Sequence, residues 1–566
     1  MTSLHGCPKL HRMRTPWRAA LIGAAVAALV TLPGLGSGTL WDNSETAYGE
    51  VAREIFLARD WIVLHFNGDP WFVQPPLYFW IAAICAKILG VTTLALRLPA
   101  ALATIAMGAI TAYAVARQAG TRAGIYAGVI LSTCLMQAIV GRLAIMDALL
   151  DLSVAATIFW WFRAVQTGED SYFICGWIAA AFGFLAKGPV APVVALLVIV
   201  PYYLWERRAT HARPPGWRAW AGGIALFAVI VLPWLVALWQ RAGSSSVAEL
   251  LGHYTFGRYT GTIESQSGPV WYYLPVIILG FFPWIAFLPS AVASAVRRLR
   301  DPAATTGERR LHQLIRLAFV WMVLPLIFFS FARTKLPNYI ALELPAPALL
   351  VALYFETALE RVRGRSALIS TAAVPLTILL VAIAIVIFSR DNRLNAELAV
   401  AARSLIWVGG AIFAGSIVSF ALLFNRARAF AAPYVLGFSM ALAIGLLALV
   451  VLPQGEQFKP VPHLASLIDS RRLPGDDVAI QNLAGGNALI FYTRPVVYVF
   501  ARPGEPIANG TANPRNIICG APRLWLIAPR HKPFTQNTFG RKRTLVTTWG
   551  EANLYLYTGP TCPQHA

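Results

Sequence analysis

Two groups of acidic side chains stand at the edges of long apolar stretches, although only 26 of the 566 residues are Asp or Glu. The segment "WDNSETAYGEVAREIFLARDW" follows the first apolar stretch and contains Asp42 and Glu45, and Asp147 opens the apolar run "IMDALLDLSVAATIFWW". An acid within a membrane or at its edge is a functional candidate by default, and a carboxylate there is suited to general acid–base chemistry. Asp42, Glu45 and Asp147 are therefore the candidate catalytic residues.

Each of these acids also has a purely structural interpretation. Apolar residues follow Ser44 at helical spacing, so the first acidic group fits the solvated face of an amphipathic helix with Ser44 as its N-cap. Asp147 fits the first turn of a helix, where the helix dipole favours a carboxylate. The residues alone leave both interpretations open.

Three cations interrupt apolar runs in a similar way. Lys187 lies in "FLAKGPV", and Arg333 and Lys335 lie in "FARTKLPNY". Cations beside lipid tails suit an anionic ligand that resides in the membrane, such as a lipid phosphate or pyrophosphate. The alternative is that these side chains extend to ordinary lipid headgroups.

The composition predicts the elements that must position these residues. Hydrophobic residues make up 57% of the chain and charged residues 13%, and apolar runs recur from about residue 17 to about residue 453. Runs of roughly 17 to 22 residues match a hydrocarbon core of ~30 Å, in which helices satisfy their own backbone groups. The chain is predicted to be a polytopic membrane protein.

The net charge of +21 does not indicate nucleic-acid binding, because the basic residues lie in short clusters between apolar runs. Placing every such cluster in the cytoplasm gives about thirteen membrane-spanning helices, provided that "PPLYFWIAAICAKILG" is an interfacial helix. This topology puts the first loop, Asp147, Lys187 and Arg333 on the outer face.

After Pro453 the hydropathy falls, and the strand-like runs "VVYVF", "RLWLIAP" and "ANLYLYTG" appear between Gly, Pro and Asn. The predicted fold is an all-α polytopic membrane protein with interfacial helices in the first outer loop and a small C-terminal α/β domain. We expect a transmembrane domain over residues 1–453 and a periplasmic domain over residues 454–566.

The sequence contains no P-loop, no GxGxxG dinucleotide motif, no HExxH motif and no nucleophile elbow. A soluble nucleotide-linked donor therefore has no evident binding loop. This favours a donor that is already embedded in the bilayer.

The ordered segments "GDPWFVQPPLYFW", "ALRLPAALATIAMG", "RLAIMDALLDL", "FLAKGPV", "PVWYYLPVIILGFFPW" and "RTKLPNYI" carry a family resemblance. The chain resembles bacterial integral-membrane glycosyltransferases of the GT-C type, in the aminoarabinose transferase and protein O-mannosyltransferase-like group. The resemblance implies transfer of a sugar from a polyprenyl-phosphate donor at the outer face of the inner membrane. The acceptor is lipid A, another lipid or a protein.

This resemblance implies an acidic pair just before Thr-x-Tyr in the first outer loop. Glu45 keeps its place before Thr46 and Tyr48, but Ser44 stands where the leading acid is expected, and Asp42 lies two residues earlier. Val73 and Gln74 stand where the aminoarabinose enzymes have Glu-Lys before Pro-Pro. These departures argue against an aminoarabinose transferase in the strict sense, but not against sugar transfer.

The expected mechanism is inverting transfer, with Asp42 or Glu45 as the general base on the acceptor hydroxyl. Asp147 orients the first-loop helix or shares a divalent metal, and the need for a metal or other cofactor stays open. Arg53 also has a local explanation, as the partner of acids one turn away. The residues assigned to substrate binding are Tyr48, Arg53, Gln74, Lys187, Arg258, Arg333, Lys335 and Tyr339.

Two alternatives remain at this stage. One is a non-enzymatic lipid or ion transporter, although the unusual charges lie at helix ends and no paired repeat is found. The other is an inactive transferase homologue that binds polyprenyl phosphate. The predicted partners are a polyprenyl-phospho-sugar donor, a lipid or protein acceptor and the lipid bilayer, and nucleic acid is not among them.

Overall fold

The computed structural model describes residues 8–40, 43–210, 215–261, 266–361, 365–390, 396–425, 427–481, 486–493, 496–500, 511–512, 514–530 and 538–560. The chain divides into two compact units, each built from separate stretches of sequence. Unit 1 comprises Met1–Leu35, Phe72–Tyr78 and Arg97–Val451. Unit 2 comprises Gly36–Trp71, Phe79–Leu96 and Leu452–Ala566.

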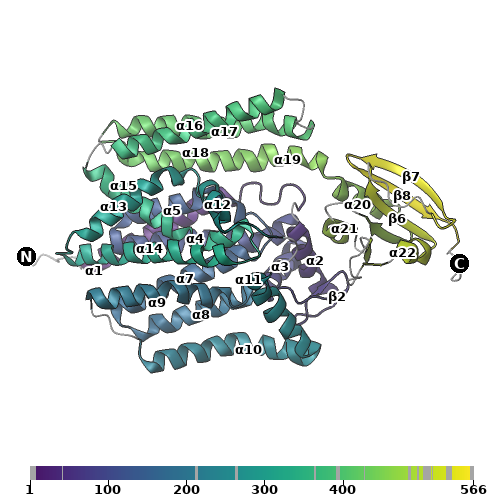
Figure 1. Ribbon diagram of the computed structural model, residues 1–566, viewed down its shortest axis with the longest axis horizontal. Helices are drawn as coiled ribbons and strands as arrows, with labels where there is room; N and C mark the ends of the chain where they lie inside the picture. The colour runs from purple at the N-terminus through teal and green to yellow at the C-terminus, as the bar shows by residue number, and fades with distance from the viewer. Residues whose placement is uncertain are drawn as a thin grey trace, which may run out of the picture. The chain divides into compact units, whose positions relative to one another are not determined.

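Unit 1 is helical, and Figure 1 shows its long helices lying alongside one another. Its longer helices are α1 (Pro8–Thr31), α4 (Thr93–Ala119, of which Arg97 onward belongs to this unit), α5 (Thr121–Thr133), α7 (Asp147–Thr167), α8 (Asp170–Lys187), α9 (Val190–Thr210), α10 (Trp217–Ala248), α13 (Leu288–Arg300), α14 (Thr306–Phe331), α15 (Pro345–Arg361), α16 (Arg365–Arg390), α17 (Ala396–Leu423) and α18 (Ala432–Leu446). Shorter helices are α6 (Leu135–Val140), α11 (Gly257–Thr260) and α12 (Tyr273–Gly280).

The helices confirm a multi-pass membrane protein. Among the described residues, 7 helices are long and apolar enough to cross a membrane, or up to 9 if each of two bent helix pairs is one span. Three apolar helices are shorter, including α3 (Leu77–Leu89) with 13 residues. At ~1.5 Å per residue, α3 is about 20 Å long, less than a bilayer core requires. The number of thirteen crossings stays a prediction.

Small residues allow the helices of unit 1 to pack closely, as expected where neighbouring lipid provides little hydrophobic driving force. A Cβ at Gly176 of α8 would lie 2.2 Å from Nε1 of Trp161, and one at Gly183 would lie 2.9 Å from Cβ of Ser153. Both facing residues belong to α7. The α7–α8 pair is therefore a close-packed helical hairpin.

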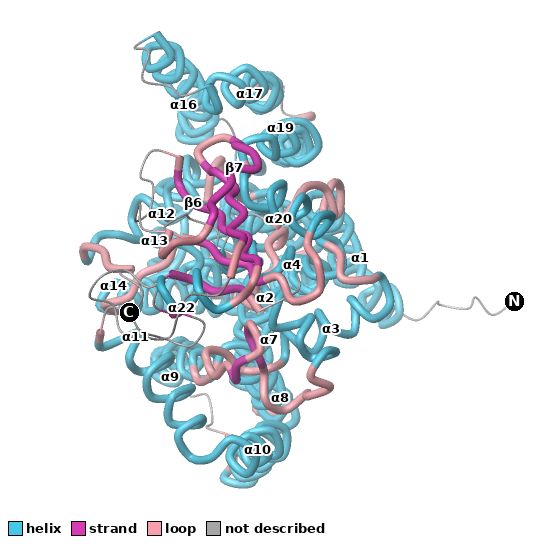
Figure 2. The backbone as a smooth tube through the Cα atoms, turned by 90° about the vertical axis from the view of Figure 1, so that its right-hand side faces the viewer, coloured by secondary structure: helices cyan, strands magenta, loops and turns pink. Residues whose placement is uncertain are grey.

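Unit 2 contains a mixed six-stranded sheet, drawn in magenta in Figure 2. Its order is β5-β4-β3-β6-β8-β7, with parallel pairs β5-β4, β4-β3 and β3-β6 and antiparallel pairs β6-β8 and β8-β7. The strands are β3 (Asp477–Ile480), β4 (Val497–Phe500), β5 (Thr511–Ala512), β6 (Arg523–Pro529), β7 (Lys542–Trp549) and β8 (Ala552–Thr558). The three strand-like runs of the sequence form β4, β6 and β8, which confirms the predicted sheet.

Some helices of unit 2 lie in or just after the first loop, and the others precede the strands of the sheet or lie between them in the chain. They are α2 (Asn43–Leu57), the Phe79–Leu89 part of α3, α19 (Leu452–Gly455), α20 (Pro460–Arg471), α21 (Gly486–Thr493) and α22 (Pro514–Gly520). Helix α2 begins at Asn43, so Ser44 lies in its first turn and is not the N-cap.

The first loop also contains a small hairpin, β1 (His65–Phe66) and β2 (Asp69–Pro70), that was not predicted. Asn67 and Gly68 between them have φ values of 56° and 86°. An Asn-Gly pair with positive φ at both positions forms the turn that matches the twist of two antiparallel strands. The Asn-Gly dipeptide is thus the feature of the sequence that could have predicted this hairpin.

The predicted domain boundary after residue 453 lies close to Leu452, where the last stretch of unit 2 begins. The structure adds the first loop and most of α3 to that stretch. The C-terminal sheet and the acid-bearing helix α2 thus belong to the same unit, which the sequence did not predict.

Candidate active site

The centre of the candidate site in unit 1 is an ion pair between Asp147 and Lys187, whose Oδ1 and Nζ atoms are 2.5 Å apart. Asp147 is the first residue of α7 and Lys187 the last residue of α8. The two helices have 21 and 18 residues and are joined only by Gly168 and Glu169. Because consecutive helices of similar length fold back on each other, the end of α8 meets the start of α7.

The sequence around Lys187 explains why the helix stops there. Gly188 has a φ of 71°, a conformation that glycine adopts without strain, and Pro189 follows it. Lysine at a helix C-terminus and aspartate at an N-terminus both interact favourably with the helix dipoles. The side chains of Lys187 and Asp147 are only 12% and 4% exposed, so the pair is largely shielded from solvent.

Three further side chains surround the pair. Asn338 donates from Nδ2 to Oδ1 of Asp147 at 2.7 Å, and Nζ of Lys187 lies 4.9 Å from the ring centre of Tyr339. Arg258 donates from Nη1 to the hydroxyl of Tyr339 at 3.1 Å. Tyr339 thereby links the two cations, and Asn338 holds the carboxylate that pairs with the first of them.

Backbone hydrogen bonds fix Arg258 relative to the segment that leads to Tyr339. The amides of Arg333 and Thr334 donate to the carbonyls of Tyr259 and Arg258, each at 3.0 Å. The hydroxyl of Thr334 donates to the carbonyl of Gly261 at 2.9 Å. These bonds hold α11 and the residue after it to the loop that follows α14, so the guanidinium and the phenol are positioned by the main chain.

Lys187, Arg258 and Tyr339 line a cavity of about 260 Å³. Gln74 also lines it and is itself 5% exposed. Most of the remaining wall is apolar and comes from helices long enough to span a membrane, with contributions from Leu150, Val190, Val193, Phe328 and Phe329. The cavity therefore combines cationic and hydrogen-bonding groups with a hydrophobic wall.

Two predicted phosphate ligands are absent from the lining of this cavity among the described residues. Arg333 is exposed, and Lys335 is buried, with its ammonium donating to the main-chain carbonyl of Ala332. Burial also lowers the pKa of Lys335. The structure brings Lys187, Arg258, Gln74 and Tyr339 together, but not the side chains of Arg333 and Lys335.

The first-loop candidates belong to unit 2. Asp42 lies outside the described residues, whereas Glu45 is completely buried in the first turn of α2. Tyr48 packs edge-on against Trp71 and Phe79, with ring centres 6.1 and 5.7 Å apart. Tyr48 is thus part of an aromatic cluster within its own unit.

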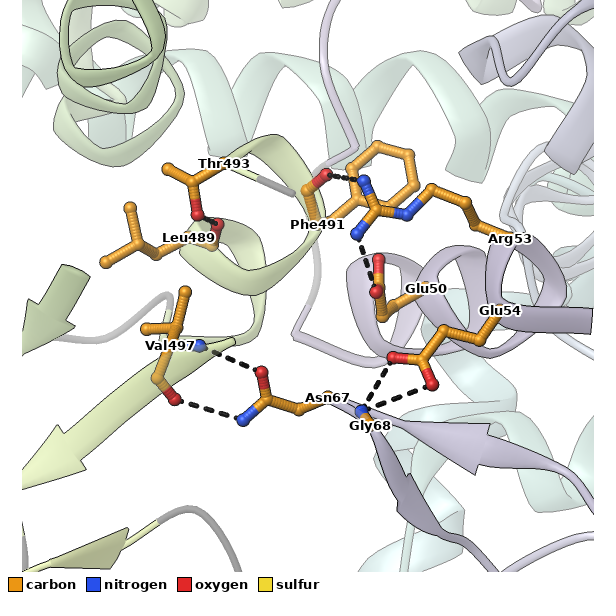
Figure 3. Close-up of polar contacts among 9 residues, drawn as sticks. All are labelled: Glu50, Arg53, Glu54, Asn67, Gly68, Leu489, Phe491, Thr493 and Val497. Carbon is orange, nitrogen blue, oxygen red and sulfur yellow. Dashed lines mark hydrogen bonds and ion pairs between the residues drawn. The ribbon is translucent and has the colours of Figure 1, made fainter. Parts of the chain in front are cut away.

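Arg53 forms the local ion pair that the sequence suggested, with its Nη2 atom 2.6 Å from Oε1 of Glu50 (Figure 3). Burial of Glu50 raises its pKa to about 7, although Arg53 opposes this shift. The neighbouring Glu54 raises it further, and Glu54 itself accepts the amide of Gly68 at 3.0 Å. Helix α2 therefore carries a buried acid that titrates near neutral pH.

The described residues contain no group of three or more His, Cys, Asp or Glu side chains that could hold a metal ion. The sequence analysis missed Asn338, which lies in the short 3-10 helix Pro337–Glu343, because a single Asn after Pro337 carries no recognisable spacing.

Comparison with known proteins points to membrane sugar transferases. Residues 73–236 match the family described as dolichyl-phosphate-mannose-protein mannosyltransferase. The undecaprenyl phosphate-alpha-4-amino-4-deoxy-L-arabinose arabinosyl transferase 2 of Proteus mirabilis is 30% identical over 352 residues, which is 60% of this chain and 60% of that protein. The corresponding transferase of Pseudomonas aeruginosa is 31% identical over 58% of this chain and 57% of its own length.

The chain thus aligns with about three fifths of the length of these relatives. The crystal structure of ArnT from Cupriavidus metallidurans bound to undecaprenyl phosphate superposes over 96% of this chain and 99% of that one, with a TM-score of 0.79 and 21% identity. The resemblance that the motifs predicted is confirmed: in sequence this chain is similar to the aminoarabinose transferases, and it has the GT-C fold of ArnT.

Proposed function

We propose that the protein is a membrane glycosyltransferase that moves a sugar from a polyprenyl-phosphate-linked donor to a lipid A-like lipid or to a protein. The observation that carries this proposal is the pairing of Lys187 with Asp147 at a cavity that Arg258 also lines and whose wall is largely apolar. A ligand with an anionic head and a hydrocarbon tail satisfies both parts of that cavity.

The proposed chemistry is a single inverting displacement. The acceptor oxygen forms a bond to the anomeric carbon while the bond from that carbon to the phosphate oxygen breaks, and its electron pair leaves with the phosphate. Lys187 and Arg258 stabilise the charge that develops on this leaving group. The acceptor proton goes to a carboxylate, which from the sequence is Asp42 or Glu45.

The names of these relatives support the donor class. The relatives named above act from undecaprenyl phosphate-linked aminoarabinose, and ArnT was crystallised with undecaprenyl phosphate. Gln74 lines the cavity at the position where the resemblance expects Lys. An amide offers only a neutral hydrogen bond. We therefore propose that the sugar differs from aminoarabinose, or that fewer cationic side chains hold the donor phosphate.

We further propose about thirteen crossings of a bacterial inner membrane, with the donor site and the C-terminal sheet on the periplasmic side. Reporter fusions test this topology. A reporter that is active only outside the cytoplasm should be inactive after Thr210, beside a basic cluster, and active after Gly475. The reverse result would refute the proposed orientation.

The direct test is a transfer assay with purified protein, a panel of radiolabelled polyprenyl-phospho-sugars, and lipid and protein acceptors. Label should move to one acceptor class and should require Lys187, whereas Lys87→Met should leave transfer intact. Lys87 is a suitable control because its side chain is exposed and makes no hydrogen bond or ion pair with the described residues. Binding of labelled lipid without consumption would instead favour an inactive homologue, and movement of intact lipid between leaflets would favour a transporter.

A further inference from the structure

Helix α2, which carries Glu45, is attached to the C-terminal part of unit 2 at three successive places. Before the helix, the amide of Leu40 donates to the hydroxyl of Tyr492 at 2.9 Å. On the helix, Nη1 of Arg53 donates to the carbonyl of Phe491 at 3.3 Å. After the helix, Asn67 makes two hydrogen bonds to Val497, as described next. A helix held before, along and after its length has little freedom to shift.

In the attachment after the helix, one side-chain amide pairs with both main-chain groups of a strand residue. Asn67 donates from Nδ2 to the carbonyl of Val497 and accepts the amide of Val497 on Oδ1, each at 3.0 Å. Figure 3 shows this paired contact beside the Arg53 contact. Because Val497 is the first residue of β4, the first loop is hydrogen-bonded directly to the start of a sheet strand.

Arg53 is the central attachment and has two partners. One Nη atom pairs with Glu50 on its own helix, and the other reaches Phe491 on α21, 438 residues away in sequence. The guanidinium also lies 5.9 Å from the centre of the Phe491 ring. Gly49 makes room for this ring, since a Cβ at that position would lie 3.1 Å from Cε2 of Phe491.

We propose that Arg53 is a positioning residue: it fixes the acid-bearing helix α2 on α21, so that the C-terminal α/β segment is part of the catalytic machinery. This inference rests on the proposed function, since it assigns Arg53 to the geometry of the transfer step and not to donor binding. Both Nη atoms of Arg53 are engaged within unit 2, and its side chain is only 13% exposed, so little of the guanidinium faces solvent, where a substrate phosphate would approach.

The test compares Arg53→Met, Arg53→Lys and Arg59→Met. Arg59 lies just beyond the end of α2, is exposed, and makes no hydrogen bond or ion pair with the described residues, so it is the matched control. The readouts are kcat and KM for the donor, donor binding, and hydrogen exchange over residues 43–57. Exchange detects loosening of α2 whether or not transfer occurs.

Arg53→Met should speed hydrogen exchange over residues 43–57 and lower kcat by about tenfold to a hundredfold, because small displacements of a reacting group are this costly. KM and donor binding should stay within about twofold of wild type. Arg53→Lys should recover part of kcat, since an ammonium can still meet Glu50 or the carbonyl, and Arg59→Met should match wild type.

Unchanged exchange in Arg53→Met, or a raised KM with unchanged kcat, would overturn the positioning role, and the second result would return Arg53 to donor binding. If Arg53→Met does not fold, Tyr492→Phe and Asn67→Ala remove the flanking attachments and should produce smaller changes in the same direction. An inactive wild-type protein would refute the proposed function, whereas the exchange measurement would still decide whether Arg53 holds α2.

Discussion

Two buried acid–base pairs, Asp147 with Lys187 in unit 1 and Glu50 with Arg53 in unit 2, have nearly equal contact distances of 2.5 and 2.6 Å. They differ in what the cation contacts besides its acidic partner. Lys187 lines a cavity, whereas Arg53 contacts the carbonyl of Phe491. A buried ion pair therefore indicates a ligand site only where its cation also faces open space, and charge alone does not distinguish the two cases.

The largest expected effect is on the cavity side of this comparison. Lys187→Met should lower transfer by at least about a hundredfold, because a preorganised charge beside a leaving group is usually worth that much or more. Lys187→Arg should retain part of the activity. Rates are measured with saturating donor, and Lys87→Met is the control. Full activity in Lys187→Met would show that Lys187, like Arg53, does not hold the donor.

The second prediction concerns the stability of unit 1. Asp147→Asn should lower the free energy of unfolding by about 3 kcal/mol, because it leaves the largely buried ammonium of Lys187 without its charge partner. Adding Lys187→Met to the same protein should recover much of this loss. Thermal unfolding in detergent measures both. Equal stability of the single and double variants would contradict the expected cost of leaving the Lys187 ammonium without its charge partner.

The third prediction concerns pH and the other pair. Because the pKa of Glu50 is raised from 4.5 to about 7 in the folded protein, the unfolded chain releases this proton first as pH rises. Its contribution to the free energy of unfolding should therefore decrease between about pH 4.5 and pH 7 and stay constant above. Burial is the main cause, and Glu54 adds to it while Arg53 opposes it.

The measurement is the difference in unfolding temperature between wild type and Glu50→Gln from pH 4.5 to pH 8. This difference should change through the stated window, with Glu50→Gln gaining relative to wild type as pH rises. Glu551→Gln, at an exposed turn between β7 and β8, should run parallel to wild type. A flat difference for Glu50→Gln would show that its carboxyl is ionised throughout.

The smallest effect is expected at the contact between α2 and α21. Gly49→Ala should destabilise unit 2 by about 1 kcal/mol, since the new methyl meets Leu96, Phe491 and Leu40 at 2.9 to 3.2 Å and outweighs the gain in helix propensity. Gly410→Ala in α17 has no neighbour within 4 Å and should be neutral or stabilising. If Gly49→Ala also stabilises, the contact with Phe491 is looser than described.

The sequence predicted the parts of the site that depend on local signals. Asp147 and Lys187 were found because each stands where an apolar run starts or stops, and Gly188 with Pro189 marks the break. The sheet strands were found from their apolar runs. Asn338 was missed because nothing in its neighbours indicates that it meets a residue 191 positions earlier.

The remaining differences arise from contacts between distant parts of the chain. Arg333 and Lys335 share a motif with Asn338 and Tyr339, yet only the latter two reach the Asp147–Lys187 pair. Likewise, the membership of α2 in the unit of the C-terminal sheet depends on Arg53 and Asn67, whose partners lie more than 400 residues away. One-dimensional patterns carry no information on such pairs.

The discontinuous make-up of unit 2 has a consequence for biosynthesis. Its first loop, up to Trp71, is synthesised early, but the stretch that completes the unit begins at Leu452. At 5 to 20 residues per second, the roughly 380 intervening residues take about 20 to 75 s to synthesise. Throughout that interval α2 and the loop after it lack α21 and β4, with which Arg53 and Asn67 form their hydrogen bonds. A nascent chain of this protein therefore has to complete its last hundred or so residues before its first loop can form these contacts.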